Sequence, residues 1–150
     1  MQPLPDKPSD LIRLALKDED KANRSPRYRV NMQIWHEVYT YDRQQLCHVC
    51  FAGAVMAFTL GAKWADDLEP EDFINGNHDK LNALDAFRTG DIYEGVGIMQ
   101  LIGKVRKANI FDEEEFHPHF YFPIADYEDN RRKWRKSMFG IANIFAGGGL

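Results

Sequence analysis

Residues 44–58 read Gln44-Gln45-Leu46-Cys47-His48-Val49-Cys50-Phe51-Ala52-Gly53-Ala54-Val55-Met56-Ala57-Phe58, which is the most apolar part of the chain and holds its only two thiols. The apolar run from Leu46 to Ala62 falls just short of a membrane span and contains a histidine. We therefore expect a buried helix from Asp42 to Ala62, capped near Asp42. Its small residues, Ala52, Gly53, Ala54 and Ala57, would let another element approach the helix closely.

The flanking sequence predicts a small sheet and further helices. From Tyr28 to Trp35, apolar and polar residues alternate, which is typical of a half-buried strand. The run Phe120 to Phe122 is bounded by prolines and fits a short edge strand. Helices are expected over Ser9 to Lys21 with Ser9 as N-cap, His78 to Thr89, Ile92 to Val105, and Tyr127 to Phe145. The predicted fold is α+β, mainly α: about five helices around the central buried helix, with a two- to three-stranded sheet.

Length and composition favour one folded domain over residues 1–150, with frayed ends at 1–8 and 147–150. A hydrophobic share of 44% with 13% aromatic residues excludes a disordered chain. The net charge of −4 gives no broad electrostatic footprint for nucleic acid, although local patches remain open. Without a visible secretory signal, a cytoplasmic protein that does not enter the membrane is expected. The oligomeric state stays open, with a homodimer among the options.

The two thiols allow four interpretations, of which a thioredoxin-like redox pair is the least favoured, because the parallel fold that it needs is not indicated by the sequence. Free cysteines pack as small hydrophobes, and positions 46, 49, 50 and 53 form a stripe that a core would want. A thiol at a helix N-terminus has a lowered pKa, which would suit Cys50 as a nucleophile. Cys47 and Cys50 also form a zinc half-site that His117 and His119 could complete, so zinc is the one cofactor considered.

The C-terminal helix carries a cluster of cations around one aromatic residue. Such a pattern is typical of helices that bind phosphates or anionic surfaces. The competing interpretation is that the cations solvate an outer face and pair with acids at 112–115 or 126–129. The candidate binding residues are Arg131, Arg132, Lys133, Trp134, Arg135 and Lys136, with a second, aromatic candidate at Trp35 and His36 near the Phe120 region.

Two resemblances extend these interpretations. Gln44, Cys47, Cys50, Phe51 and Ala52 match the spacing of the papain-type cysteine protease signature. That resemblance implies Cys50 as nucleophile, Gln44 as oxyanion donor, His117 or His119 as base and Asp126 as orienter. The chain departs from the family at the spacer His48-Val49 and at Phe51, where a tryptophan is usual.

The second resemblance covers the whole chain. Trp35-His36, followed by Cys47-x-Val49-Cys50-x-Ala52-Gly53-Ala54-Val55-Met56-Ala57, resembles small uncharacterised proteins of tailed bacteriophages. It implies a phage-encoded accessory protein that acts in the host cytoplasm by binding a host protein, nucleic acid or nucleotide. That non-enzymatic role is the leading hypothesis, with a small papain-like cysteine hydrolase and a structural zinc domain as alternatives.

Overall fold

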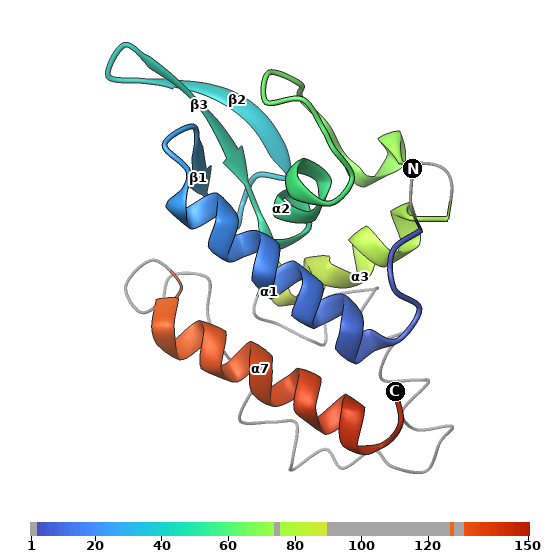
Figure 1. Ribbon diagram of the computed structural model, residues 1–150. Helices are drawn as coiled ribbons and strands as arrows, with labels where there is room; N and C mark the ends of the chain where they lie inside the picture. Colours follow the sequence, from blue (N-terminus) through green and yellow to red (C-terminus); the bar gives the residue numbers. More distant parts are fainter. Residues whose placement is uncertain (1–2, 74–75, 90–126, 128–130) are drawn as a thin grey trace.

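The computed structural model describes residues 3–73, 76–89, 127 and 131–150. The elements are α1 (Pro8–Arg24), β1 (Tyr28–Val30), β2 (His36–Tyr41), β3 (Gln44–Val49), α2 (Phe51–Phe58), a 3₁₀ turn η1 (Pro70–Asp72), α3 (His78–Thr89) and α7 (Arg131–Gly147) (Figure 1). The mainly helical α+β class is confirmed. The expected arrangement of about five helices around one central helix is not matched, since the described residues hold four α-helices. The expected helix at 92–105 and strand at 120–122 lie outside the described residues.

The helix expected from Asp42 to Ala62 is wrong over its first half, because Asp42 and Arg43 form a hairpin turn. Both have positive φ angles, 48° and 65°, as a two-residue hairpin loop requires. β2 and β3 pair antiparallel, with Tyr41 opposite Gln44 and His36 opposite Val49. β3 is the middle strand of the order β1-β3-β2, so a nearly continuous apolar run joins it to α2 and hides its period of two.

The strand expected over Tyr28 to Trp35 ends at Val30. β1 runs parallel to β3, with Tyr28 opposite Cys47. The side chain of Asn31 then accepts a hydrogen bond of 3.0 Å from the backbone N–H of Gln33, which turns the chain. The next strand, β2, begins at His36. The sheet is therefore built entirely from residues 28–49 in the described part of the chain.

α1 begins one residue before the predicted start and ends three residues after the predicted end. Pro8 occupies the first turn, and the N-cap is Lys7, so the prediction of Ser9 as N-cap is wrong. The preceding segment is anchored: Leu4 is buried, and its backbone N–H donates to the Asn77 side chain at 2.9 Å. At the other end, Leu150 packs against the core.

The predicted close approach to the small residues of α2 is confirmed at Gly53. A Cβ atom built there would lie 1.6 Å from the carbonyl oxygen of Trp35. The same carbonyl accepts a hydrogen bond from the backbone N–H of Cys50 at 3.3 Å. Gly53 thus lets the segment before β2 pass directly over α2.

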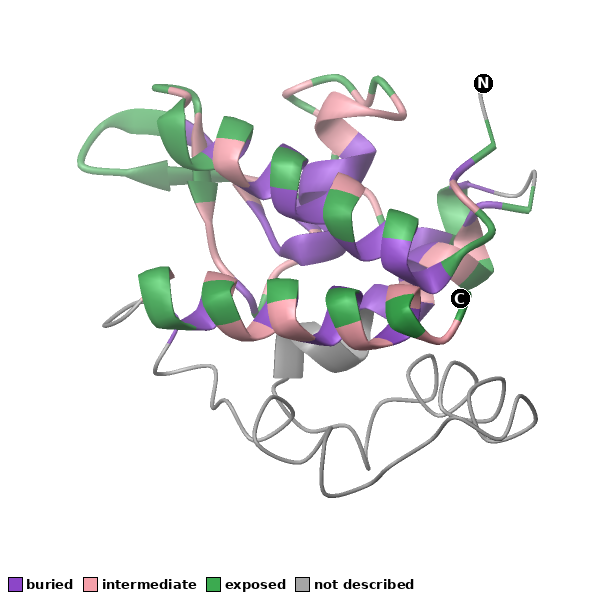
Figure 2. Cartoon of the chain, turned by 60° about the horizontal axis from the view of Figure 1, so that its bottom comes forward, coloured by how far each residue is buried: buried purple, intermediate pink, exposed green. Residues whose placement is uncertain are grey.

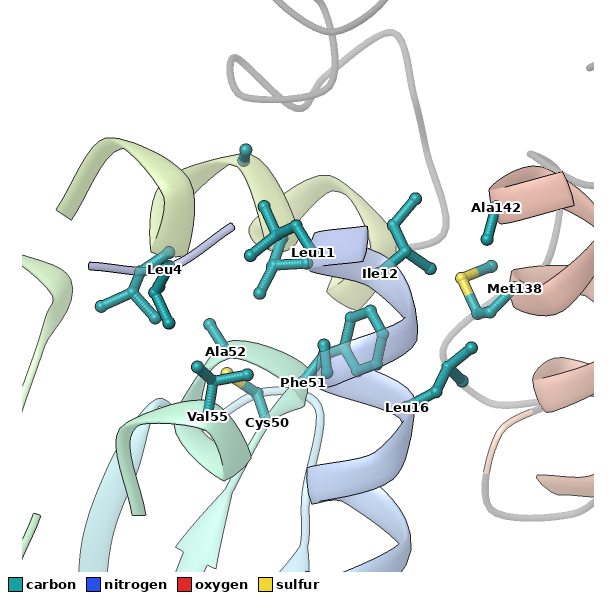
Figure 3. Close-up of a cluster of buried hydrophobic side chains, with 14 of the residues drawn as sticks. Leu4, Leu11, Ile12, Leu16, Cys50, Phe51, Ala52, Val55, Met138 and Ala142 are labelled. Carbon is teal, nitrogen blue, oxygen red and sulfur yellow. The ribbon is translucent and has the colours of Figure 1, made fainter. Parts of the chain in front are cut away.

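The core lies between α1, α2, α3 and α7. Leu11 and Leu16 of α1, Phe51 of α2 and Met138 of α7 point into one cluster (Figure 3). α1 contacts both α2 and α7. Four residues of α7 at spacings of four, three and four are buried: Trp134, Met138, Ile141 and Phe145. Among the described helices, none has the length and apolar character needed to cross a membrane.

Candidate functional site

Cys47 lies inside β3 and packs against the ring of His36 from β2. Its Sγ atom is 3.7 Å from both ring nitrogens. Equal distances place the sulfur off the lone-pair axis of either nitrogen, so the contact is not an aligned thiol–imidazole hydrogen bond. Nδ1 of His36 instead donates to the carbonyl oxygen of Asp66 at 2.7 Å. His36 is therefore held as a core residue that ties β2 to the loop after α2.

The chemistry of Cys47 follows from its burial. Desolvation raises the pKa of this thiol to about 12, with only partial compensation from a backbone hydrogen bond to Glu37. The group is consequently a neutral thiol at physiological pH. A nucleophilic cysteine needs the opposite shift, toward the thiolate.

Cys50 stands at the N-cap of α2, where its Sγ accepts a hydrogen bond from the backbone N–H of Gly53 at 3.4 Å. It is fully buried in the main core cluster, without access for a substrate. Gln44 begins β3, so the strand separates it from Cys50 by roughly 20 Å. The other residues of the papain-type set, His117, His119 and Asp126, lie outside the described residues.

The predicted zinc ligands are also separated in part. Cys47 packs in a small cluster with Ala22, Val49 and Ala54, whereas Cys50 belongs to the larger cluster. His117 and His119 lie outside the described residues. Within the part of the chain that the structure describes, no group of three or more histidine, cysteine or carboxylate side chains could hold a metal ion.

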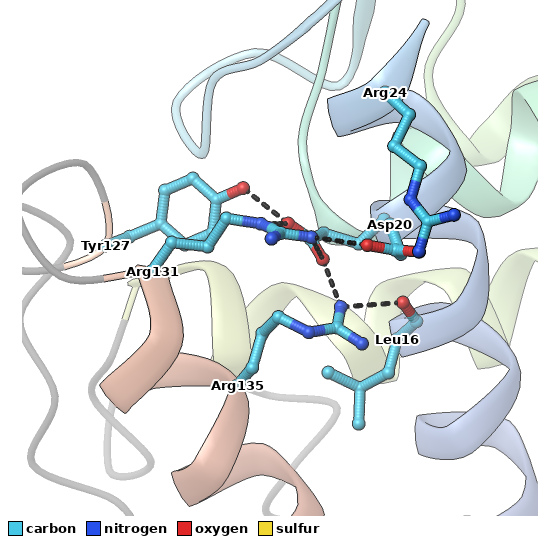
Figure 4. Close-up of polar contacts among 7 residues, drawn as sticks. Leu16, Asp20, Arg24, Tyr127, Arg131 and Arg135 are labelled. Carbon is cyan, nitrogen blue, oxygen red and sulfur yellow. Dashed lines mark hydrogen bonds and ion pairs between the residues drawn. The ribbon is translucent and has the colours of Figure 1, made fainter.

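The basic helix α7 divides its cations between two sides. On the inner side, Arg131 and Arg135 both bind the carboxylate of Glu19 on α1, and Arg131 does so through Nε at 2.7 Å (Figure 4). The hydroxyl of Tyr127 donates to the same carboxylate at 2.6 Å. Arg135 also donates to the Leu16 carbonyl oxygen at 2.8 Å. The side chain of Glu19 is 0% exposed, so these donors compensate a fully buried charge.

The same contacts shift the pKa values of Asp20 and Tyr127. Burial alone would raise the pKa of Asp20, but the hydrogen bond from Arg131 and the charges of Arg24 and Arg135 lower it overall. Burial and the adjacent carboxylate of Glu19 raise the pKa of Tyr127 well above its ordinary value. Arg131 and Arg135 are therefore structural. The segments that hold the acids predicted as partners, 112–115 and 126–129, lie outside the described residues apart from Tyr127, and the acidic partners found within the described residues are Glu19 and Asp20 of α1.

Other cations of α7 lie on its outer, exposed side. α1 and α7 lie side by side and antiparallel: Arg131 binds Asp20 near one end, and Arg13 donates to the Asn143 side chain at 3.1 Å near the other. Their exposed residues turn toward the same side of the molecule (Figure 2). We call Arg13 and Lys17 of α1, with Arg132 and Lys136 of α7, the basic face. In the described part of the chain, none of the four has an ion-pair partner.

The second predicted binding patch lies elsewhere and has the opposite charge. Trp35 and His36 border an open pocket of about 410 Å³ at the start of β2. Four acidic residues, Glu37, Asp67, Glu69 and Asp72, line the same pocket. Such a pocket repels phosphate, so the predicted binding residues do not form one anion site.

Sequence reasoning missed the contribution of α1 to the basic face. In the charged run from Lys17 to Lys21, Lys17 is exposed, but Asp18 and Glu19 are both buried. The spacing of Arg13 and Lys17, four residues apart on a helix, was the signal available. Their juxtaposition with α7, more than 100 residues later, could not be read from the sequence.

No family model, curated protein or solved structure matches this chain. Neither the papain-type nor the phage-protein resemblance gains support from these comparisons.

Proposed function

We propose that this protein is a non-catalytic nucleic-acid-binding protein that engages the phosphate backbone through its basic face. The observation that carries the proposal is the segregation of charge on α1. Asp18 and Glu19 are buried. Arg13 and Lys17 on the same helix are exposed beside Arg132 and Lys136. A chain with a net charge of −4 thus presents four exposed cations on one surface, none of which has an ion-pair partner among the described residues.

The acidic residues near the basic face reduce its positive charge only in part. Asp20 is held by Arg131 at 3.0 Å and Arg24 at 2.6 Å, so its charge is compensated. Asp10 is exposed near the N-terminal end of α1 and has no ion-pair partner among the described residues. Cations that contact phosphates gain affinity by releasing counterions, and this gain needs a local patch, not a basic protein overall. We expect weak, salt-sensitive binding without long-range steering.

Nucleic acid fits the basic face better than the other partners in the hypothesis. The cores of protein–protein interfaces are depleted in lysine, and this face is mostly charged. A nucleotide would need an enclosed site with convergent donors, whereas the pocket beside Trp35 is lined by acids. The phage origin and the host cytoplasm as its setting stay predictions.

The non-catalytic part of the proposal rests on the thiols. Cys47 has a raised pKa and Cys50 is fully buried, so neither presents an accessible thiolate. A cysteine hydrolase needs an accessible and activated sulfur. The cysteines serve the core instead.

Fluorescence anisotropy with a short labelled DNA tests the proposal. The triple variant Lys17→Gln, Arg132→Gln, Lys136→Gln should weaken binding about tenfold or more at low salt, because three phosphate contacts are lost. The matched control removes three exposed cations outside the basic face: Arg29→Gln, Arg43→Gln, Lys63→Gln. It changes the net charge equally and should bind nearly as well as the wild type.

Two outcomes would contradict the proposal. Equal losses in both triple variants would mean that overall charge matters and the basic face does not. Tighter binding to anionic vesicles than to DNA would assign the face to a lipid surface. Circular dichroism of both variants checks that the substitutions leave the fold intact.

A further inference from the structure

Phe139 is an exposed aromatic side chain within the basic face. It is 42% exposed, and Tyr39 and Tyr41 of the sheet hairpin are the other large hydrophobic side chains exposed in the described chain. On α7 it lies one turn beyond Lys136 and one turn before Asn143. Because Arg135 contacts Leu16 and Asn143 contacts Arg13, Phe139 faces the part of α1 that carries the cations.

The ring is held in place by a cation. The guanidinium carbon of Arg135 lies 5.5 Å from the ring centroid of Phe139, and Arg135 is itself fixed by Glu19 and the Leu16 carbonyl. A cation over the face of an aromatic ring is attracted to the ring, and this modest attraction restrains the ring's position. Phe139 is thus a restrained, partly exposed ring beside the cations of the basic face.

We infer that the basic face binds single-stranded nucleic acid, with a base stacked on Phe139 and the flanking phosphates on the four cations. The inference rests on the proposed function and specifies its ligand. Single-strand binding surfaces combine a positively charged track with aromatic rings, because every base has a face that can stack. A paired base inside a duplex has no free face to offer.

The shape of the face also favours a single strand. A B-DNA major groove is about 12 Å wide and admits one helix. α1 and α7 lie side by side, and packed helices are about 8–10 Å apart between their axes, so the pair is too broad to enter the groove. A duplex could therefore contact the basic face only through its phosphate backbone.

A lipid surface fits less well. Interfacial helices bury a continuous apolar side in the membrane. The apolar side of α7 is already occupied by the core through Trp134, Met138, Ile141 and Phe145. Phe139 alone is left for insertion.

The test compares single-stranded DNA with its duplex, using wild type, Phe139→Ala and Phe139→Trp. Phe139→Ala should weaken single-strand binding about tenfold and leave duplex binding within about twofold, because one stacked base is lost. Phe139→Trp should retain or strengthen single-strand binding. Tyr41→Ala is the matched control, since Tyr41 is 68% exposed on the hairpin, away from the basic face, and it should change neither.

The outcomes separate this inference from the proposed function. If duplex and single strand bind equally well and Phe139→Ala changes neither, the single-strand inference is wrong while the basic face still binds nucleic acid. If the wild type binds neither DNA, the proposed function fails as well. Vesicle binding that falls with Phe139→Ala, without DNA binding, would overturn both.

Discussion

At the residue scale, two neighbouring carboxylates on α1 have opposite environments. Asp18 is 1% exposed; Thr59 donates to one oxygen, and the other has no hydrogen-bond partner, with Lys21 3.7 Å away. Burial raises the pKa of Asp18, in spite of these neighbours. Asp20 has a lowered pKa because Arg131, Arg24 and Arg135 outweigh its burial. Compared with the unfolded chain, the folded state therefore shifts Asp18 toward its protonated form and Asp20 toward its ionised form.

Asp18→Asn should stabilise the protein at neutral pH. A raised pKa in the folded state means that the stability contributed by Asp18 is fully present below its unfolded value, 3.8, and is lost as the pH rises through the folded value. Asparagine has no charge to desolvate, so we expect a gain of about 1 kcal/mol in the free energy of unfolding. Urea unfolding over a pH series measures it, and the gain should vanish in acid.

Asp20→Asn is the control with the opposite sign. Its lowered pKa means that its stability is present above the unfolded value and is lost as the pH falls through the folded value. This variant should lose stability at neutral pH. A destabilised Asp18→Asn protein at neutral pH would contradict the prediction. It would mean that the contacts of the ionised carboxylate with Thr59 and Lys21 outweigh its desolvation.

At the element scale, how far the sequence predicts the fold depends on how each element is exposed. α3 was predicted at its observed bounds, and a helix was predicted over most of α7, because each helix keeps a polar side. β3 was mistaken for a helix because the middle strand of the sheet has little polar alternation and runs straight into α2. Asp42 read as a helix cap although it starts a hairpin turn, a choice that Tyr39-Thr40-Tyr41 before it already favoured.

The candidate site could be predicted only in part for a related reason. The cations of α7 were recognised as a binding candidate, but their division into inner and outer sets depends on Glu19 of α1. Tertiary packing decides which side of a charged helix is used internally. No local pattern in residues 131–136 carries that information.

Gly53→Ala should strongly destabilise the contact between α2 and the segment before β2. The new Cβ would clash with the Trp35 carbonyl oxygen, a backbone atom that cannot rotate away. We expect a loss of about 3 kcal/mol in the free energy of unfolding. Gly147→Ala is the control, because nothing lies within 4 Å of its Cβ position. Equal stability of the two variants would contradict the close packing.

Glu19→Gln should loosen α7 from α1. The substitution removes the charge that compensates Arg131 and Arg135 and leaves two partly buried guanidinium groups without it. Breaking a buried ion pair from one side costs about 3 kcal/mol or more. Urea unfolding measures the loss, with Lys136→Gln on the exposed side expected to change stability by less than about 0.5 kcal/mol. A loss below about 1 kcal/mol would mean that the network does not hold the helix.

At the scale of the whole molecule, the acidic pocket and the basic face lie on different parts of the described chain. The chain has a net charge of −4, with acidic residues around the pocket at Trp35 and cations on the α1–α7 side. The two helices of the basic face are separated by more than 100 residues and meet through the Glu19 network. The Glu19 network therefore holds α7 against α1 through Arg131 and Arg135. The four cations of the basic face stay exposed beside it.

The most direct test of this account is the salt dependence of single-stranded DNA binding. Each phosphate neutralised on a single strand contributes about −0.7 to the slope of log affinity against log salt. Four contacts predict a slope of about −3 for the wild type, and about −1 for the triple variant Lys17→Gln, Arg132→Gln, Lys136→Gln. A wild-type slope near zero, or equal slopes for both proteins, would contradict the claim that the basic face binds nucleic acid.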